Sequence, residues 1–338
     1  MSDTVLLTGV TGFLGGHIAK SLLDRGYHVR GSLRNPDRAP QTAAAIETLG
    51  ADVSRLDFVQ LDLLRDAGWQ EAADGARYMV HSASPFVTSM PRDPSVLIEP
   101  AVRGTERAIQ AAKNAGTEKI VLTSSLAAIV YGRGRNRPQK LGPDDWPDPA
   151  EGLLSAYALS KLLAERRAWE LVESGPALTV VNPGFIIGPL PDSDPGTSGA
   201  ILLRLLRGDI PMLPKLSFHP VDVRDLADIH ANALTSDAMN GKRVPAGFGP
   251  VSMQELARDL ADDLPDYANR IPNRVAPNWL IRLIALFDRD LRANVSELGY
   301  APSLDSSRGK ELLGRTPRTS RQAVADMASD MIAKGLLK

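Results

Sequence analysis

Residues 4–15 read TVLLTGVTGFLG, a short apolar run that leads into three glycines spaced three residues apart. The apolar run predicts a buried strand and a helical pattern follows it, which favours a dinucleotide-binding turn over a plain turn. In such a turn, one glycine makes the tight bend, one lets the backbone approach a pyrophosphate, and one lets helix and strand pack closely. The helix N-terminus then offers unpaired N–H groups to phosphate. The cofactor-binding residues predicted here are Gly9, Thr11, Gly12, Phe13, Leu14 and Gly15.

The first two-thirds of the chain alternates apolar runs with helical patterns, as in a parallel sheet built from βαβ units. Strands are predicted over 4–8, 28–33, 58–61, 78–82, 119–124 and 178–182, and helices over 15–25, 42–49, 96–115 and 155–173. Several strands are apolar on both faces, as expected for strands covered by helices on both sides. The predicted fold class is α/β, a Rossmann-type doubly wound parallel sheet.

After residue 183 the pattern loosens, with frequent prolines and with helices predicted over 199–207, 253–262, 276–287 and 322–334. We interpret residues 1–183 as the dinucleotide-binding domain, with further core segments at about 215–235. Residues 184–338 are predicted to form mainly a smaller C-terminal substrate-binding lobe.

Composition excludes several classes of function. The net charge of −1 gives no global attraction to nucleic acid or to an anionic membrane. The 338 residues contain no cysteine, which excludes disulfides, thiolate catalysis and cysteine-ligated metals, and the five histidines are scattered, so no metal site is predicted. No apolar run approaches the roughly 20 residues that span a bilayer, and no secretory segment is evident. We therefore expect a cytoplasmic protein.

The end of the second predicted strand bears on the choice of cofactor. An NAD site usually places an acid about 20 residues after the glycine turn, to bind the ribose 2′-hydroxyl. Here residues 27–36 contain no acid, and Arg30, Arg34 and Arg38 lie in or just after this segment. Guanidinium groups suit a 2′-phosphate, although these could also be solvated loop charges. We predict NADP(H), with Arg34 as the main contact because it lies where the strand ends.

Three polar residues form the predicted catalytic set. Tyr157 and Lys161 form a Y-x-x-x-K pattern, which places both side chains on one face of a helix. A free tyrosine has a pKa of about 10, and a nearby ammonium lowers it, so that the phenol can act as a general acid or base. Ser124 and Ser125 follow a buried strand at its carboxyl end, where a hydroxyl can share developing alkoxide charge. We predict Ser125, in preference to Ser124, as the third member, although each pattern alone also occurs on ordinary helices and turns.

In this order of motifs, about residues 4–230 resemble the extended short-chain dehydrogenase/reductase family. The resemblance rests on the glycine turn, Asp62-Leu63, HSASP over 81–85, TSS over 123–125, Tyr157 with Lys161, NPGFIIGP over 182–189 and HPVDVRDL over 219–226. The runs VRGSLRNP over 29–36 and PAVRG over 100–104 look like the dihydroflavonol, cinnamoyl-CoA and methylglyoxal (ketone) reductase branch, which implies NADPH and carbonyl reduction. The chain reads GLLSAY over 152–157 and lacks the NWYxY approach of cinnamoyl-CoA reductases, so no thioester substrate is expected.

The resemblance also implies roles for individual residues. Asp62 would contact the adenine amine, with Leu63 packed beside the ring, and Ser198 would either cap its helix, which we favour, or touch the cofactor phosphates. Further implied cofactor contacts are Ala83, Ser84, Thr123, Tyr157, Lys161, which would anchor the ribose hydroxyls, Pro183 and Ile186. The implied substrate pocket contains Ser84, Phe86, Val87, Ser125, Tyr157 and Phe185. The two phenylalanines favour a largely apolar ligand, although either also suits core packing.

The predicted function is an NADPH-dependent carbonyl reductase for ketones or aldehydes, reversible as an alcohol dehydrogenase. One alternative is an NAD-dependent nucleotide-sugar epimerase or dehydratase, which usually has the acid that this chain lacks after strand two. A second is a non-catalytic NADP-sensing regulator, against which the retained Ser125, Tyr157 and Lys161 argue. A homodimer through the helix of Tyr157 is also compatible with the resemblance. The apolar residues that fit this contact, and equally fit packing on the sheet, are Leu162, Leu163 and Trp169.

Overall fold

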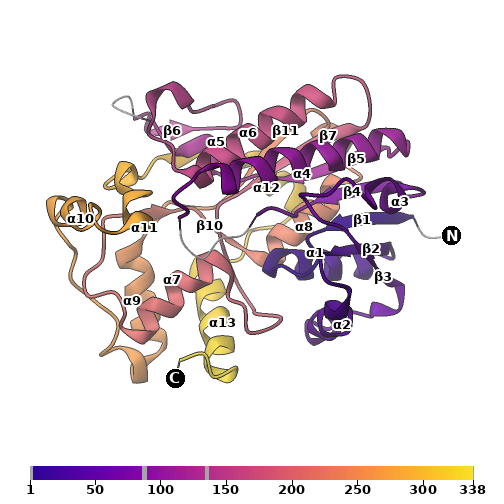
Figure 1. The fold of residues 1–338 in the computed structure, drawn as a ribbon. Coiled ribbons are helices and arrows are strands. Elements are labelled where there is room, and N and C mark those ends of the chain that lie inside the picture. The colour runs from indigo at the N-terminus through magenta and orange to yellow at the C-terminus, as the bar shows by residue number, and fades with distance from the viewer. Residues whose placement is uncertain (1–2, 86–89, 134–136, 338) are drawn as a thin grey trace.

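The computed structural model describes residues 3–85, 90–133 and 137–337, and its centre is a seven-stranded sheet (Figure 1). The strand order is β11-β7-β5-β4-β1-β2-β3, and all neighbouring strands run parallel. The strands are β1 (Thr4–Thr8), β2 (His28–Leu33), β3 (Leu56–Gln60), β4 (Tyr78–His81), β5 (Lys119–Thr123), β7 (Ala177–Pro183) and β11 (Lys242–Ala246). The predicted Rossmann-type α/β class is confirmed.

Helices cover both faces of the sheet, and alternation along each strand supplies both cores. In β1, Val5 and Leu7 join a core with α1 and α8, whereas Leu6 joins a second core with α3, α4 and α6. The first layer contains α1 (Phe13–Asp24), α2 (Ala39–Thr48), α8 (Val223–Ala233) and α12 (Ser307–Leu313). The second layer contains α3 (Trp69–Ala73), α4 (Ser95–Asn114), α5 (Ala127–Val130) and α6 (Ala156–Leu171).

The remaining elements form a lobe beside the sheet, with an apolar core of its own (Figure 1). Its helices are α7 (Gly196–Arg207), α9 (Met253–Asp263), α10 (Asn278–Ile284), α11 (Arg289–Arg292) and α13 (Ser320–Ala333). Three two-stranded pairs accompany them: β8 (Phe185–Ile187) with β10 (Pro220–Asp222), β9 (Ser217–Phe218) with β12 (Val251–Ser252), and β6 (Lys140–Leu141) with β13 (Ser303–Leu304). In the described part of the chain, no helix is long and apolar enough to cross a membrane.

Several sequence predictions differ from the structure. The predicted strand over 58–61 begins earlier, at Leu56, and the predicted helix over 276–287 is regular only over α10. The edge strand β11 was not predicted, because its sequence KRVPA contains two charges and a proline. Ser198 does not cap α7: the cap position is Pro195, Ser198 lies inside the helix, and no side chain of a described residue caps it. The predicted capping role of Ser198 is therefore wrong.

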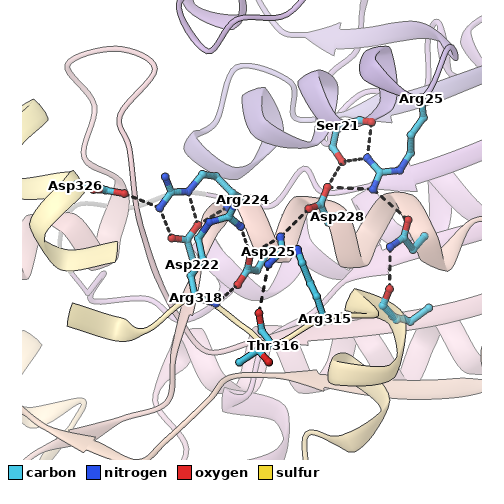
Figure 2. Close-up of polar contacts among 12 residues, drawn as sticks. Ser21, Arg25, Asp222, Arg224, Asp225, Asp228, Arg315, Thr316, Arg318 and Asp326 are labelled. Atoms are coloured by element: carbon cyan, nitrogen blue, oxygen red, sulfur yellow. Dashed lines mark hydrogen bonds and ion pairs between the residues drawn. The ribbon is translucent and has the colours of Figure 1, made fainter. Parts of the chain in front are cut away.

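Ion pairs tie the C-terminal segment to the start of α8 (Figure 2). Asp222 and Asp326 both bind Arg224, each with an oxygen 2.6 Å from its Nη2. Asp225 is fully buried and binds the guanidinium groups of Arg315 and Arg318. Residues 315–326 are thus fixed to a helix that covers the sheet.

The next turn of α8 extends the same network to α1 (Figure 2). Asp228 accepts hydrogen bonds from the Ser21 hydroxyl at 2.9 Å and from Arg25 at 3.1 Å. It also binds Arg315 at 3.1 Å. Helix α1, which follows the glycine turn, is therefore linked through α8 to the C-terminal segment.

Candidate active site

The glycine turn joins β1 to α1, and each of its glycines has a different environment. Gly9 has a φ of +78°, and a Cβ there would lie 2.8 Å from the backbone of Ala83. A Cβ on Gly15 would lie 2.0 Å from the Gly9 carbonyl oxygen, so Gly15 permits the close packing of helix and strand. Gly12 precedes α1, and a Cβ there would meet only the Gly9 oxygen, at 3.5 Å. Among the described residues, no side chain caps α1, so the N–H groups of Phe13 and Leu14 face outward as an anion site requires.

The three arginines after the second strand have different surroundings. Arg30 donates to the carbonyl oxygens of Ala72 and Asp74 at 2.6 and 2.9 Å, so it fixes the end of α3. Arg34 is exposed just beyond β2. Arg38 lines a depression beside the glycine turn; its other lining residues include Thr11, Gly12, Phe13, Gln41 and Thr42. Arg34 and Arg38, unlike Arg30, therefore remain candidates for binding a 2′-phosphate.

Asp62 and Leu63 lie just beyond β3. The Asp62 carboxylate accepts a hydrogen bond from the Leu64 N–H at 2.9 Å, and its carbonyl accepts one from Trp69 at 3.2 Å. A Cβ on Gly104 of α4 would lie 2.5 Å from Leu63, so the absence of a side chain at residue 104 makes room for Leu63. This packing holds the predicted adenine-binding pair at the carboxyl edge of the sheet.

The ends of β1 and β4 are joined by a hydrogen-bonded threonine. The Thr8 hydroxyl lies 2.8 Å from Nδ1 of His81 and accepts from the Ala83 N–H at 3.1 Å. His81 is buried, and its pKa falls to about 3 through burial and the nearby charge of Lys161. His81 is therefore a neutral core residue, as its position at the end of a strand predicts, and it orients the segment that contains Ala83 and Ser84.

Ser125, Tyr157 and Lys161 lie together at the carboxyl edge of the sheet. The Ser155 hydroxyl caps α6 by accepting from the Ala158 N–H at 3.2 Å, so Tyr157 and Lys161 occupy the first turns of that helix. Ser125 follows β5, and its side chain lies close enough to Tyr157 to lower the pKa of the phenol against the effect of burial. Lys161 lines a cavity with six other polar residues, His81, Ser84, Thr105, Thr123, Ser124 and Glu165.

Burial controls the protonation of this trio. It raises the pKa of Tyr157, and the Ser125 hydrogen bond only partly opposes it. Lys161 is not among the causes of this shift, so its lowering of the Tyr157 pKa stays a prediction. Burial also lowers the pKa of Lys161 to about 8, against the opposing charge of Glu165. At neutral pH, the phenol holds its proton and most of the lysine remains charged, which suits donation of a proton to a carbonyl oxygen.

Only some of the other predicted contact residues lie near Ser125, Tyr157 and Lys161. Phe185 stacks on Phe218, with ring centroids 4.5 Å apart, and belongs to the core of the lobe. The Thr123 hydroxyl lies 2.9 Å from Nε2 of His230 on α8. Pro183 ends β7 and Ile186 lies in β8, so both stand where the chain leaves the sheet for the lobe. Phe86 and Val87 lie outside the described residues.

Sequence reasoning missed three polar residues beside the trio. Glu165, Asn182 and Arg243 form a buried cluster directly behind Ser124. A signal for Glu165 exists, because it follows Lys161 at the helical spacing of four. In the described part of the chain, no three histidine, aspartate or glutamate side chains gather in a way that could hold a metal ion.

Known proteins resemble this chain in sequence and in structure. Residues 5–247 match the model of the NAD dependent epimerase/dehydratase family. A putative dihydroflavonol 4-reductase of Synechocystis is 30% identical over 96% of this chain and 94% of its own length, and cinnamoyl-CoA reductase 1 of Petunia hybrida is 36% identical over 68% of each. The structure of yeast methylglyoxal/isovaleraldehyde reductase complexed with NADPH is similar with a TM-score of 0.81 and 26% identity, covering 99% of this chain and 100% of that one.

Proposed function

This chain belongs to the NAD dependent epimerase/dehydratase family, and we propose that it is an NADPH-dependent carbonyl reductase with Ser125, Tyr157 and Lys161 as its catalytic residues. The relatives named above are reductases, and the yeast enzyme was solved with NADPH, which supports both the reaction and the cofactor. The catalytic assignment rests on Ser125, which follows β5 and lies close enough to Tyr157 to affect its phenol, and on Lys161, one helical turn beyond Tyr157 on α6.

The residues of the turn fit NADPH. The uncapped N-terminus of α1 and the missing side chain of Gly12 leave room for a pyrophosphate. Arg34 and Arg38 would bind the 2′-phosphate, while Asp62 and Leu63 would hold the adenine. When bound, NADPH supplies the hydride that reduces the carbonyl carbon.

Side chains of this protein would then bind the substrate oxygen and donate a proton to it. The hydroxyls of Ser125 and Tyr157 bind the carbonyl oxygen and favour the alkoxide that develops there. Tyr157 donates its proton to that oxygen, since burial keeps the phenol protonated at neutral pH. The ammonium of Lys161 stabilises the phenolate that remains until solvent returns the proton. For the finer substrate class, we propose a largely apolar ketone or aldehyde, because the family resemblance implies that Phe185, which stacks on Phe218, contributes to the substrate pocket.

The test is oxidation of NADPH and NADH, in parallel, by the purified protein with a panel of apolar and polar ketones and aldehydes. We expect rapid loss of NADPH absorbance with apolar carbonyl compounds and slow loss with NADH. No oxidation of either cofactor, together with NAD released on denaturation, would instead support the nucleotide-sugar epimerase alternative. Binding of NADPH without turnover of any substrate would support a regulator.

We expect Arg34→Ala and Arg38→Ala each to raise the KM for NADPH about 10- to 100-fold, because each removes a charge-assisted hydrogen bond to the 2′-phosphate. The KM for NADH should change little. Arg30→Ala is the matched control, since Arg30 binds carbonyl oxygens of α3 and should lower stability without changing cofactor preference. Steady-state kinetics with both cofactors decide this, and an equal loss for NADPH and NADH would refute the 2′-phosphate role.

Two further parts of the proposal concern assembly and location. A homodimer would use the outer faces of α4 and α6, but Leu162 is buried and Trp169 packs on the core beneath, so neither residue supports the contact. The outer faces instead carry ion pairs, such as Arg167 with Glu106 at 2.8 Å. Light scattering tests the dimer, and cell fractionation tests the cytoplasmic location.

A further inference from the structure

A buried carboxylate lies one helical turn beyond Lys161. Glu165 is fully buried, and both of its oxygens accept hydrogen bonds. Oε1 accepts from Nε of Arg243 at 2.6 Å, and Oε2 accepts from the Ser124 hydroxyl at 2.5 Å and from the Asn182 amide at 2.8 Å. A carboxylate so far from water requires such partners, since an unpaired buried charge is strongly unfavourable.

The partners of Glu165 come from three neighbouring strands. Ser124 follows β5, Asn182 lies in β7 and Arg243 lies in the edge strand β11. Through them, Glu165 fixes the spacing of the strand ends at which the substrate oxygen would be held.

Arg243 in turn binds α5 and the segment that follows it. It is only 6% exposed and donates to the carbonyl oxygens of Pro143 at 2.9 Å, Asp145 at 2.7 Å and Ala128 at 2.9 Å. Its guanidinium carbon lies 3.7 Å from the centroid of the Trp146 ring. The cation therefore has enough partners to remain buried while it neutralises Glu165.

Two contacts connect this cluster to the catalytic trio. The Asn182 amide also donates to the Ser125 carbonyl oxygen at 3.3 Å, and Ser124 is the chain neighbour of Ser125. Glu165 lines the same cavity as Lys161, and its negative charge raises the pKa of that lysine against the effect of burial. We infer that Glu165 is a positioning residue for the proposed reduction: it fixes Ser125 through Ser124 and Asn182, and it places a carboxylate in the cavity that Lys161 lines.

Glu165 is the main negatively charged group near Lys161. The titratable groups that face Lys161 are His81 from β4, which is neutral, and Tyr157 and Glu165 from its own helix. The cavity residues contributed by α4 and β5 carry no charge; they are Ala101, Thr105, Leu122, Thr123 and Ser124. Arg243 lies behind Glu165, on the side of its Oε1.

The test is Glu165→Gln in the full chain, with the Lys161 side chain followed by NMR of protein labelled at lysine Cε and assigned with Lys161→Arg. In the wild type, we expect Lys161 to titrate at about 8. Loss of the carboxylate should lower this value by about one pH unit. The alkaline limb of kcat for NADPH oxidation should move down equally, with kcat lower by about 10-fold or more.

Asp225→Asn is the matched control, because Asp225 is equally buried and equally paired with arginine but belongs to the network of α8. It should lower the thermal midpoint and leave both the Lys161 titration and the pH profile unchanged. Glu165→Asp keeps the charge and shortens the side chain, so it should retain the Lys161 titration while kcat falls through the loss of the Ser124 and Asn182 contacts. Glu165→Asp therefore still tests the inference if Glu165→Gln does not fold.

The outcomes separate the inference from the proposed function on which it rests. A Lys161 titration that Glu165→Gln leaves unchanged, with only the thermal midpoint lowered as in Asp225→Asn, overturns the inference even if the wild type reduces carbonyl compounds. A shifted titration supports the coupling of Glu165 to Lys161, because the NMR measurement requires no substrate, even if the wild type reduces no compound in the panel.

Discussion

Replacement of Tyr157 by phenylalanine should lower kcat for carbonyl reduction by about 10²- to 10⁴-fold, the range that a positioned general acid contributes. The variant loses only the hydroxyl that donates a proton to the substrate oxygen. Binding of NADPH should stay close to wild type, because the glycine turn and the arginines that bind the cofactor are untouched. Stopped-flow absorbance gives the rate, and quenching of tryptophan fluorescence gives the affinity for NADPH.

A matched control for this variant is Tyr78→Phe. Tyr78 is also buried, but it begins β4 at the opposite end of the strand from the site and packs edge-on against Tyr27. Its loss of a hydroxyl should leave kcat within a few-fold of wild type. Full activity in Tyr157→Phe would exclude the Ser–Tyr–Lys mechanism, and loss of NADPH affinity in parallel with kcat would reassign Tyr157 to a structural role.

A second large effect is expected at Gly15. In Gly15→Ala, the new methyl group would meet the Gly9 carbonyl oxygen at 2.0 Å, and the conflict involves backbone that no side-chain rotation relieves. We expect the free energy of unfolding to fall by about 3 kcal/mol or more, the upper range for overpacked sites. NADPH affinity should be lost with the turn. Urea unfolding followed by circular dichroism measures the first effect, and cofactor titration the second.

Gly12→Ala separates cofactor binding from stability. A methyl group at Gly12 has room, 3.5 Å from the Gly9 oxygen, and the backbone there is extended. The free energy of unfolding should therefore change by only about 1 kcal/mol, whereas a pyrophosphate that approaches this backbone would be hindered and the Kd for NADPH should rise at least about 10-fold. Equal stability of the two variants would contradict the packing role of Gly15, and an unchanged Kd in Gly12→Ala would contradict the approach of phosphate.

Much of the fold could be predicted because the deciding signals are local. The limits of β1 and β2 agree residue for residue with the strands predicted over 4–8 and 28–33, and the glycine spacing predicts the turn between β1 and α1. By contrast, β11 has the composition of a surface loop, and it becomes a strand because β7 offers it an unpaired edge. Tertiary context of this kind is invisible in a single sequence.

The same division applies to the candidate site. Ser125, Tyr157 and Lys161 come from two short motifs, so their meeting follows from the fold. The pairing of Glu165 with Arg243 does not, since the two residues lie far apart in the chain and charged residues in such positions are usually solvated. The three arginines near β2 also look alike in the sequence, and only the orientation of its side chain assigns Arg30 to α3.

The late position of β11 in the chain has a consequence for biosynthesis. While the protein is still a nascent chain, β7 presents an open, apolar edge until residues 242–246 leave the ribosome, and such an edge attracts unwanted strand pairing. During that interval Glu165 also lacks its partner Arg243. Asp225 lacks Arg315 and Arg318 until later in synthesis, because these two arginines lie further along the chain. The sheet is thus completed only after residue 246 of the 338-residue chain has been made, and until then the open edge of β7 is exposed to unwanted strand pairing.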